Sequence, residues 1–425
     1  MATKNNKKNT KKLSIKNAVH NIRKKISSNK KKNNAKKGDS AETSKLQVIN
    51  GTRRRNKIIK IVVFSVIFVI IIALIVAHIL LPTGLVEAVQ NGYAALGSGE
   101  LPVTFYAANP TEYLKYGNIS CILNKTYFEV YNENGKLIQA ASHGLSNPKL
   151  EVSAARFLVY DFDRYGLKIY NYSTELYSTE YKNTIISADI ARNGTYAVVT
   201  TSDSYRGTVS VYNKDNELLY TWNSANNYIT DVTVAENGKS IALTLLNAKN
   251  GAYVSSVCVF NFDNPSPVAK YENNGLVSSV RTVNKNYFVA HGLNNAYMIP
   301  WSDGAPVDLG IVGNIRNIEI TKDGMMSIVY GRGDNETINT VLVLNDEGSK
   351  VASVPFNSKV TDCTVTEENI MVLSNEKIFM YDFSGNLLAT TVCDIKPLFI
   401  SACDNDTVIT VDSSKMKAVN LISGE

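Results

Sequence analysis

The chain has 425 residues, and its 45 Lys and Arg outnumber its 38 Asp and Glu, giving a formal net charge of +7. The excess lies at the amino-terminal end, because residues 1–57 hold 19 basic and 2 acidic residues, a charge of +17, and residues 58–425 carry −10. A nucleic-acid-binding domain carries its positive charge on the folded domain. The charge distribution therefore excludes nucleic acid as the expected partner.

The segment 58–81 is the first predicted element, a single helix that crosses a membrane. Ile61 to Leu81 has 21 residues, and its only polar members are Ser65 and His78. At about 1.5 Å per residue it spans roughly 32 Å, which matches a hydrocarbon core of about 30 Å. A cleaved signal peptide is the rival reading, but its apolar core would be shorter and would end in an A-x-A-like site.

The charge step across this segment predicts its orientation. Lys and Arg beside a spanning helix are retained in the cytoplasm. We therefore expect a single-pass protein of the cell membrane, with a cytoplasmic amino terminus and an extracytoplasmic main domain.

Residues 1–57 are expected to form a disordered basic tail, since they contain few large apolar residues. One stretch departs from this, because Ile15, Val19, Ile22 and Ile26 fall on one helical face. This stretch is either a helix lying on an anionic membrane surface or a solvated retention signal. The membrane-surface alternative assigns binding to Lys12, Lys16, Arg23, Lys24 and Lys25.

A stalk is expected over residues 82–100, followed by an all-β domain over 101–425. In two adjacent units an alternating strand leads to an Asn-Gly turn, Asn193-Gly194 and Asn237-Gly238, and three further strands follow each turn. Asn-Gly between alternating strands is a strong hairpin signal. Four strands in 40–45 residues is the size of a β-propeller blade.

The ends of the third strands recur along the whole domain, at intervals of 37 to 48 residues. They fall at Tyr131, Tyr170, Tyr212, Phe260, Pro300, Leu344, Tyr381 and Val419. Eight marks favour eight blades over seven. The final blade lacks room for its fourth strand, and Val103–Ala107 is the expected donor, which would remove an open sheet edge.

Three segments of these blades resemble a known family: Ile186–Thr200, Tyr205–Tyr212 and Ile229–Lys239. They are similar to the membrane-anchored bacterial proteins catalogued as domain of unknown function 5711. The resemblance covers roughly residues 55–425 and implies a basic tail, one spanning helix and a propeller-like outer domain. It implies no activity and no catalytic residues.

The connections between second and third strands are the expected binding surface. They are longest at Ser202–Gly207, Asn247–Ala252 and Gly331–Ile338, and in a propeller they open on one face, where binding usually resides. The candidate binding residues on them are Tyr205, Arg206, Lys249, Asn250, Arg332 and Asp334.

The sequence contains no recognisable catalytic motif, and no cofactor or metal site is expected. It favours a non-enzymatic binding or scaffold module for a protein, peptide or cell-wall polymer. The alternative is a propeller hydrolase or lyase whose site is assembled from residues distant in sequence, since fold does not determine function. A histidine and carboxylates together in the central channel would favour the enzyme.

Overall fold

The structure is a computed structural model that describes residues 41–272, 275–302, 304–333, 335–394 and 396–421. It contains two units, which meet within the first helix between Ile75 and Val76. This helix, α2, runs from Ala41 to Leu80, and its part Lys57–Leu80 is long and apolar enough to cross a membrane. The helix thus begins inside the expected disordered tail. Residues 41–47 include strong helix formers, so an existing helix can extend through them.

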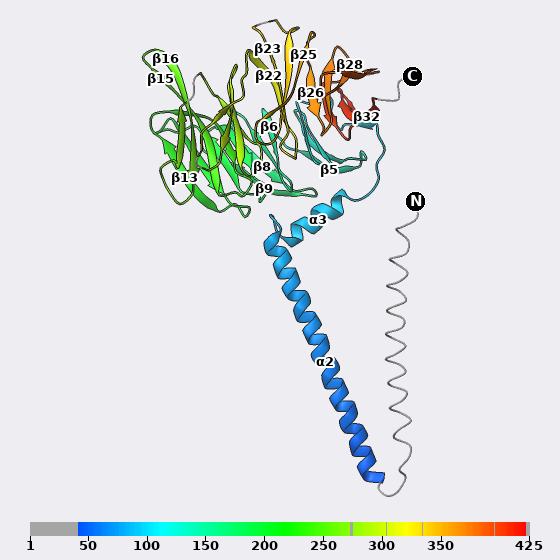
Figure 1. The fold of residues 1–425 in the computed structure, drawn as a ribbon. Coiled ribbons are helices and arrows are strands. Elements are labelled where there is room, and N and C mark those ends of the chain that lie inside the picture. Colours follow the sequence, from blue (N-terminus) through cyan, green and yellow to red (C-terminus); the bar gives the residue numbers. More distant parts are fainter. Residues whose placement is uncertain (1–40, 273–274, 303, 334, 395, 422–425) are drawn as a thin grey trace. The chain divides into compact units, whose positions relative to one another are not determined.

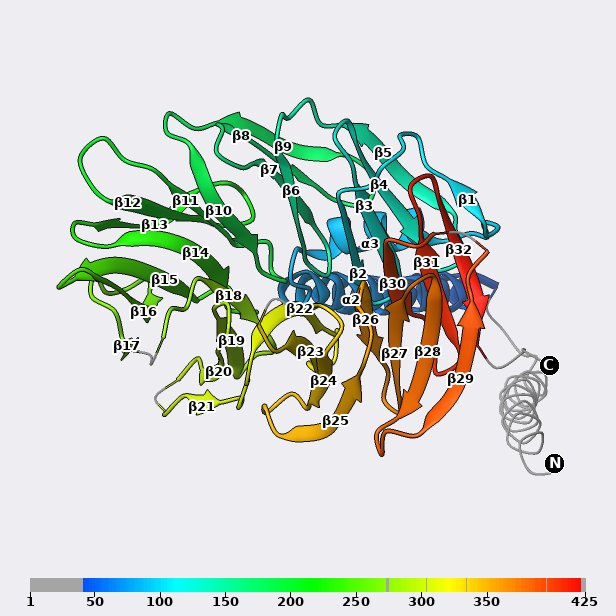
Figure 2. The same ribbon diagram turned by 90° about the horizontal axis from the view of Figure 1, so that it is seen from above.

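The second unit is a β-propeller whose described residues form eight four-stranded antiparallel sheets (Figures 1 and 2). The strands of blades 1 to 4 are β2 Glu112–Tyr116, β3 Ile119–Leu123, β4 Tyr127–Asn132 and β5 Leu137–Ser142; β6 Pro148–Val152, β7 Phe157–Asp161, β8 Gly166–Tyr170 and β9 Glu175–Glu180; β10 Ile185–Ile190, β11 Tyr196–Thr200, β12 Gly207–Tyr212 and β13 Leu218–Ser224; β14 Tyr228–Val234, β15 Ser240–Lys249, β16 Ala252–Asn261 and β17 Ala269–Glu272. The strands of blades 5 to 8 are β18 Ser279–Thr282, β19 Tyr287–His291, β20 Ala296–Pro300 and β21 Val307–Asp308; β22 Asn314–Ile320, β23 Met326–Gly331, β24 Asn339–Leu344 and β25 Lys350–Phe356; β26 Asp362–Val365, β27 Asn369–Ser374, β28 Lys377–Asp382 and β29 Leu387–Val392; β30 Phe399–Ala402, β31 Thr407–Val411 and β32 Lys415–Asn420 with β1 Val103–Thr104.

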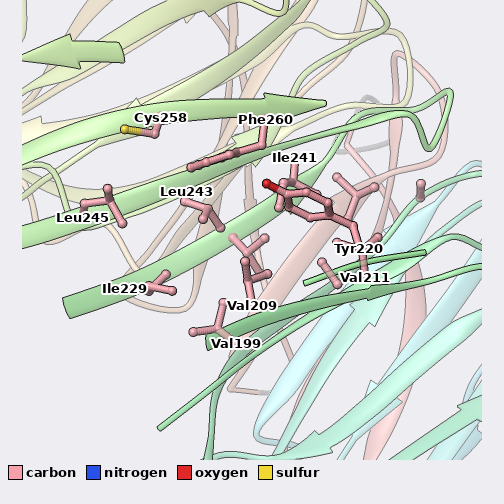
Figure 3. Close-up of a cluster of buried hydrophobic side chains, with 14 residues drawn as sticks. Val199, Val209, Val211, Tyr220, Ile229, Ile241, Leu243, Leu245, Cys258 and Phe260 are labelled. Atoms are coloured by element: carbon pink, nitrogen blue, oxygen red, sulfur yellow. The ribbon is translucent and has the colours of Figure 1, made fainter. Parts of the chain in front are cut away.

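The hydrophobic core lies between successive blades. In Figure 3, Val199, Val209 and Val211 of blade 3 face Leu243 and Phe260 of blade 4. An equivalent cluster fills each junction around the ring, including the junction of blade 8 with blade 1. Each sheet is therefore covered on both faces by its neighbours.

The ring is closed by β1, which completes blade 8 as its fourth strand (Figure 2). Val103 pairs with Met416 and Thr104 with Lys415. Phe105 follows β1, and its N–H donates to the carbonyl of Ser414 at 2.9 Å. All eight third-strand marks lie within β4, β8, β12, β16, β20, β24, β28 and β32, which confirms the eight-blade prediction.

The antiparallel order gives the propeller two distinct ends. The turns between first and second and between third and fourth strands lie at one end, which we call the tight-turn face. The connections between second and third strands, and those between blades, lie at the other end, which we call the loop face.

Helix α3, Leu85–Ala95, lies in the segment expected to be a stalk and packs on the tight-turn face. Glu87 forms an ion pair with Arg156 at 2.7 Å, and both side chains are largely buried. The backbone after the helix passes so close to the β4–β5 turn that a Cβ on Gly99 would lie 2.2 Å from the amide nitrogen of Lys136. The segment is thus held against blades 1 and 2.

We expect ring closure by β1 to contribute strongly to stability. Replacing Val103-Thr104-Phe105 by Gly-Ser-Gly keeps the chain length but removes the paired strand and buried Phe105, which is 7% exposed. Loss of a buried Phe costs about 3–5 kcal/mol, so the melting temperature should fall by at least several degrees. The same replacement at the exposed residues Asn264-Pro265-Ser266 is the control. Equal melting temperatures for both variants would mean that β1 does not hold the ring.

Candidate functional site

The first strands of the eight blades surround a central channel with a cavity of about 1030 Å³. Its lining is strongly ionic. It includes the carboxylates Glu112, Glu151, Asp189, Asp231, Glu319 and Asp362 and the cations Lys115, Lys149, Arg281 and Arg316. The ring thus brings together acids and bases that are far apart in sequence.

Several of these carboxylates join one blade to the next. Asp231 on β14 accepts hydrogen bonds at one oxygen from the amide of Val280 at 3.0 Å and the hydroxyl of Ser279 at 2.6 Å, both on β18. Its other oxygen accepts from Ser187 on β10 at 2.6 Å. The inner edge of a first strand has no neighbouring strand to satisfy its N–H groups, and at this junction a carboxylate from the preceding blade takes that place.

The same arrangement recurs at three other junctions. Glu112 accepts from the amide of Leu150 at 2.9 Å, Asp189 from that of Val234 at 2.7 Å, and Asp362 from that of Ile400 at 2.9 Å. We call these four residues, Glu112, Asp189, Asp231 and Asp362, the carboxylate clamps. Their hydrogen bonds identify them as structural groups.

Two other ionic groups in the channel are not engaged in this way. Among the described residues, Glu151 and Arg281 have no hydrogen-bond partner for their charged groups, and Arg281 is exposed to the cavity. Burial raises the pKa of Glu151, nearby Asp189 raises it further, and Arg281 opposes the shift. A carboxyl group and a guanidinium are therefore both available to a ligand in the same channel.

His291, at the end of β19, also lines the channel. Burial lowers the pKa of His291, and Arg281 lowers it further, so the neutral imidazole is favoured. Its Nδ1 lies 3.4 Å from the carbonyl oxygen of Gly292. The histidine and the carboxylates are thus in one cavity, but the ring nitrogen is oriented by a backbone group and not by an acid.

Glu319 is a further unusual carboxyl group. Its Oε1 accepts a hydrogen bond from Thr364 at 3.1 Å, while its buried Oε2 has no partner among the described residues. Burial, followed by the charge of Asp362, raises the pKa of Glu319 to about 8. Burial also raises the pKa of Asp362 to about 6, although three hydrogen bonds to its carboxylate oppose the shift.

On the loop face, the structure joins Arg206 of blade 3 to blade 4. Its guanidinium donates to the hydroxyl of Tyr228 at 2.7 Å and lies 5.2 Å from the centre of that ring. Tyr205, beside it, is 46% exposed, and Tyr228 is 51% exposed. Aromatic and guanidinium groups from two blades thus lie together on this face.

The predicted loop Asn247–Ala252 is instead the tip of a long hairpin. Strands β15 and β16 pair as far as Lys249 and Ala252, which leaves a two-residue turn of Asn250 and Gly251 (Figure 1). Both turn residues have positive φ, 53° and 81°, as a type I′ turn requires. Lys249 and Asn250 therefore lie at the end of a projecting hairpin, where Tyr253 is 69% exposed.

The remaining predicted site residues are not part of this patch. Arg332 is exposed after β23 in blade 6, two blades beyond the hairpin, and Asp334 lies outside the described residues. Lys12, Lys16, Arg23, Lys24 and Lys25 also lie outside them. Within the described part of the chain there is no group of three or more His, Cys, Asp or Glu placed to hold a metal ion.

Sequence reasoning did not identify the channel groups, although a signal for them exists. Asp189 stands five residues before Gly194 of its turn, Glu319 five before Gly324, and Asp231 seven before Gly238. A residue five or seven positions before the turn glycine lies on the first strand of its blade, with its side chain toward the channel. The offset from the turn is thus the signal that would have found them.

Comparison with known proteins identifies a family for the propeller. The model of the family of unknown function (DUF5711) matches residues 103–421, which run from β1 past the end of β32. No curated protein matches the chain.

Several solved structures are distantly similar. Hydrazine synthase from Kuenenia stuttgartiensis is 11% identical, with a TM-score of 0.45 over 76% of this chain and 98% of that chain. BamB from Moraxella catarrhalis is 9% identical, with a TM-score of 0.47 over 74% and 100% of the two chains. A eukaryotic initiation factor is 13% identical, with a TM-score of 0.49 over 79% and 90%. Likeness at this level carries no information about function.

The raised pKa of Glu319 predicts a pH-dependent stability. Between about pH 4.5 and pH 8 the folded channel holds a proton on Glu319 that the unfolded chain releases, so stability falls as the pH rises through this range. Glu319→Gln cannot ionise. It should melt near the wild-type temperature at about pH 4.5 and several degrees higher at about pH 8.5, a gain of up to about 4 kcal/mol.

Melting curves across this range check the prediction, with Glu367→Gln at an exposed carboxyl group as the matched control. A gain for Glu319→Gln that is greatest at acidic pH would contradict it.

Proposed function

Because this chain belongs to the family of unknown function DUF5711, which assigns no activity, we propose a function from its geometry. In this proposal the protein is a membrane-anchored, extracytoplasmic, non-enzymatic binding module that captures a protein, peptide or cell-wall polymer on its loop face.

The anchoring part of the proposal is supported by α2 and by the charge distribution. The 24 residues Lys57–Leu80 form a helix of about 36 Å, and none of this segment is buried. The +17 charge before it and the −10 charge after it favour a cytoplasmic amino terminus.

The observation that carries the binding part is the patch on blades 3 and 4 of the loop face. Tyr205, Tyr228 and Tyr253 are all at least 46% exposed, and Arg206 is held over the Tyr228 ring. Tyr and Arg are the side chains that most often anchor protein interfaces. Tyr205 and Arg206 come from the loop before β12, Tyr228 from β14 and Tyr253 from β16, and α3 occupies the opposite face.

A second function, a hydrolase or lyase, is favoured by the channel. His291, whose pKa is lowered by burial and by Arg281, lines the same cavity as Glu151 and Arg281. A neutral imidazole is a suitable general base, and a guanidinium can stabilise a developing negative charge. A turnover that disappears with His291→Ala, while melting is unchanged, would favour this function over simple binding.

The proposed topology predicts selective labelling of a natural cysteine. Cys403 is exposed, while Cys121, Cys258, Cys363 and Cys393 are buried. A membrane-impermeant maleimide added to intact cells should therefore label Cys403. In a Cys403→Ser background, Ser27→Cys in the basic tail should react only after permeabilisation. The reverse pattern would refute the proposed orientation.

The proposed binding surface predicts a loss of capture without a loss of folding. Replacing Tyr205 and Arg206 by Ala should lower cross-linked partner at least about tenfold, since a truncated anchor residue costs 1–2 kcal/mol or more. The melting temperature should stay nearly constant, because exposed loop changes usually cost under about 0.5 kcal/mol.

The matched control replaces Lys239 and Lys285 by Ala, two exposed residues on tight turns of blades 4 and 5. Capture that survives Tyr205→Ala with Arg206→Ala, or that is lost only in the control, would assign binding to another surface.

A further inference from the structure

Helix α3 exposes its apolar side chains and turns its charged one toward the protein, which is the reverse of an ordinary surface helix. Its exposed side carries Val86, Val89 and Tyr93, followed by Leu96 directly after the helix, and these are 61–79% exposed. Their spacing of three, four and three residues places them on one face. Its only charged residue, Glu87, faces the protein instead. A soluble surface normally shows the opposite arrangement.

The polar side of α3 is fixed to the propeller. The Glu87 carboxylate accepts two hydrogen bonds from Arg156, from Nε at 2.8 Å and from an Nη at 2.7 Å. Asn91 is 7% exposed; it donates to the carbonyl of Ala155 at 3.0 Å and accepts from the amide of Tyr172 at 3.1 Å.

The carboxyl end of α3 is tied down as well. The side-chain amide of Asn132 donates to the carbonyl of Ala95 at 3.1 Å and to that of Gly97 at 2.9 Å. Lys136 donates to the carbonyl of Ala94 at 3.0 Å. The helix therefore cannot rotate to bury Val86, Val89, Tyr93 and Leu96, which we call the apolar stripe.

We propose that the apolar stripe lies in the interfacial layer of the lipid bilayer. The inference rests on the proposed membrane anchoring and extends it, since it makes α3 a second membrane contact that is rigidly attached to the propeller.

Chain continuity identifies lipid as the occupant of this face. Only residues 81–84 separate α2 from α3, and four residues reach at most about 14 Å. They form a hydrogen-bonded turn, in which Gly84 donates to the carbonyl of Leu81 at 3.1 Å and Leu85 to Nδ1 of His78 at 3.1 Å. A helix that begins this close to the end of a spanning segment begins in the interfacial layer.

The chemistry of the stripe also fits this layer. Tyr is enriched at membrane interfaces, and an amphipathic helix in this position buries its apolar face at the boundary of headgroups and acyl chains. The exposed side of α3 carries no Lys or Arg, so the contact is with acyl chains and not with anionic headgroups. Binding should therefore not require anionic lipid. This placement of α3 in the bilayer leaves the loop face, which α3 does not touch, free for a partner.

The test uses the full chain in phosphatidylcholine vesicles, with an environment-sensitive fluorophore on one introduced, exposed cysteine in a Cys403→Ser background, where the other four cysteines are buried. Three sites are compared, all exposed: Tyr93→Cys on the apolar stripe, Tyr253→Cys on the loop face and Ile67→Cys within α2. We expect the fluorophore at Tyr93→Cys to shift to the blue and to be quenched by lipid spin-labelled near the headgroup. The one at Tyr253→Cys should show neither effect, and the one at Ile67→Cys should be quenched by lipid spin-labelled deep in the chain.

Each other outcome overturns a distinct claim. Loss of quenching at Ile67→Cys would overturn the anchoring itself. Quenching at Ile67→Cys without quenching at Tyr93→Cys would overturn the interfacial placement alone. A blue shift at Tyr93→Cys that spin-labelled lipid does not quench would show that protein, such as a second copy of this chain, covers the stripe.

Discussion

Every blade of this propeller is a thin sheet with apolar side chains on both faces, and the structure depends on covering them. Phe260 and Leu243 are buried only because blade 3 lies against blade 4, and the same holds at each junction. A row of such sheets would leave its first and last faces in water. In the closed ring these two faces cover each other, and β1 completes the ring by pairing with β32. The amino-terminal end of the domain thus decides whether its carboxyl-terminal blade is complete.

Closing the ring creates the channel and also accounts for the acidic residues that line it. The first strand of each blade has an inner edge without a strand partner, and the carboxylate clamps accept some of the N–H groups on it. Acidic residues are therefore needed near the axis for structural reasons. Burial near the axis, and then the charges of neighbouring carboxylates, raise the pKa of Glu319 and Glu151, which do not act as clamps. The raised pKa values in the channel are therefore a consequence of how the blades are joined.

The two ends of the propeller differ because α3 packs on only one of them. Helix α3 occupies the tight-turn face, where Arg156 and Asn132 hold it. On the loop face, blade 4 extends its β15–β16 hairpin, and Arg206 of blade 3 donates a hydrogen bond to Tyr228 of blade 4. In the proposed function, an attachment surface and a recognition surface are thereby separated on one scaffold.

The sequence alone determined the apolar helix and the β-rich domain, and it predicted the donor of the closing strand and favoured eight blades over seven. These follow from local signals: an unbroken apolar run, Asn-Gly turns, and third strands whose spacing repeats. The segment Asn247–Ala252 was expected to be a loop, although its Asn250-Gly251 pair is the same hairpin signal, and the pairing of β15 with β16 shows that it is a hairpin tip. The sequence alone could not place Glu151 and Arg281 in one channel, or turn the valines of α3 away from the propeller. The first arrangement joins blades more than a hundred residues apart, and the second depends on contacts of α3 with Arg156 and Asn132, which only the folded propeller brings together.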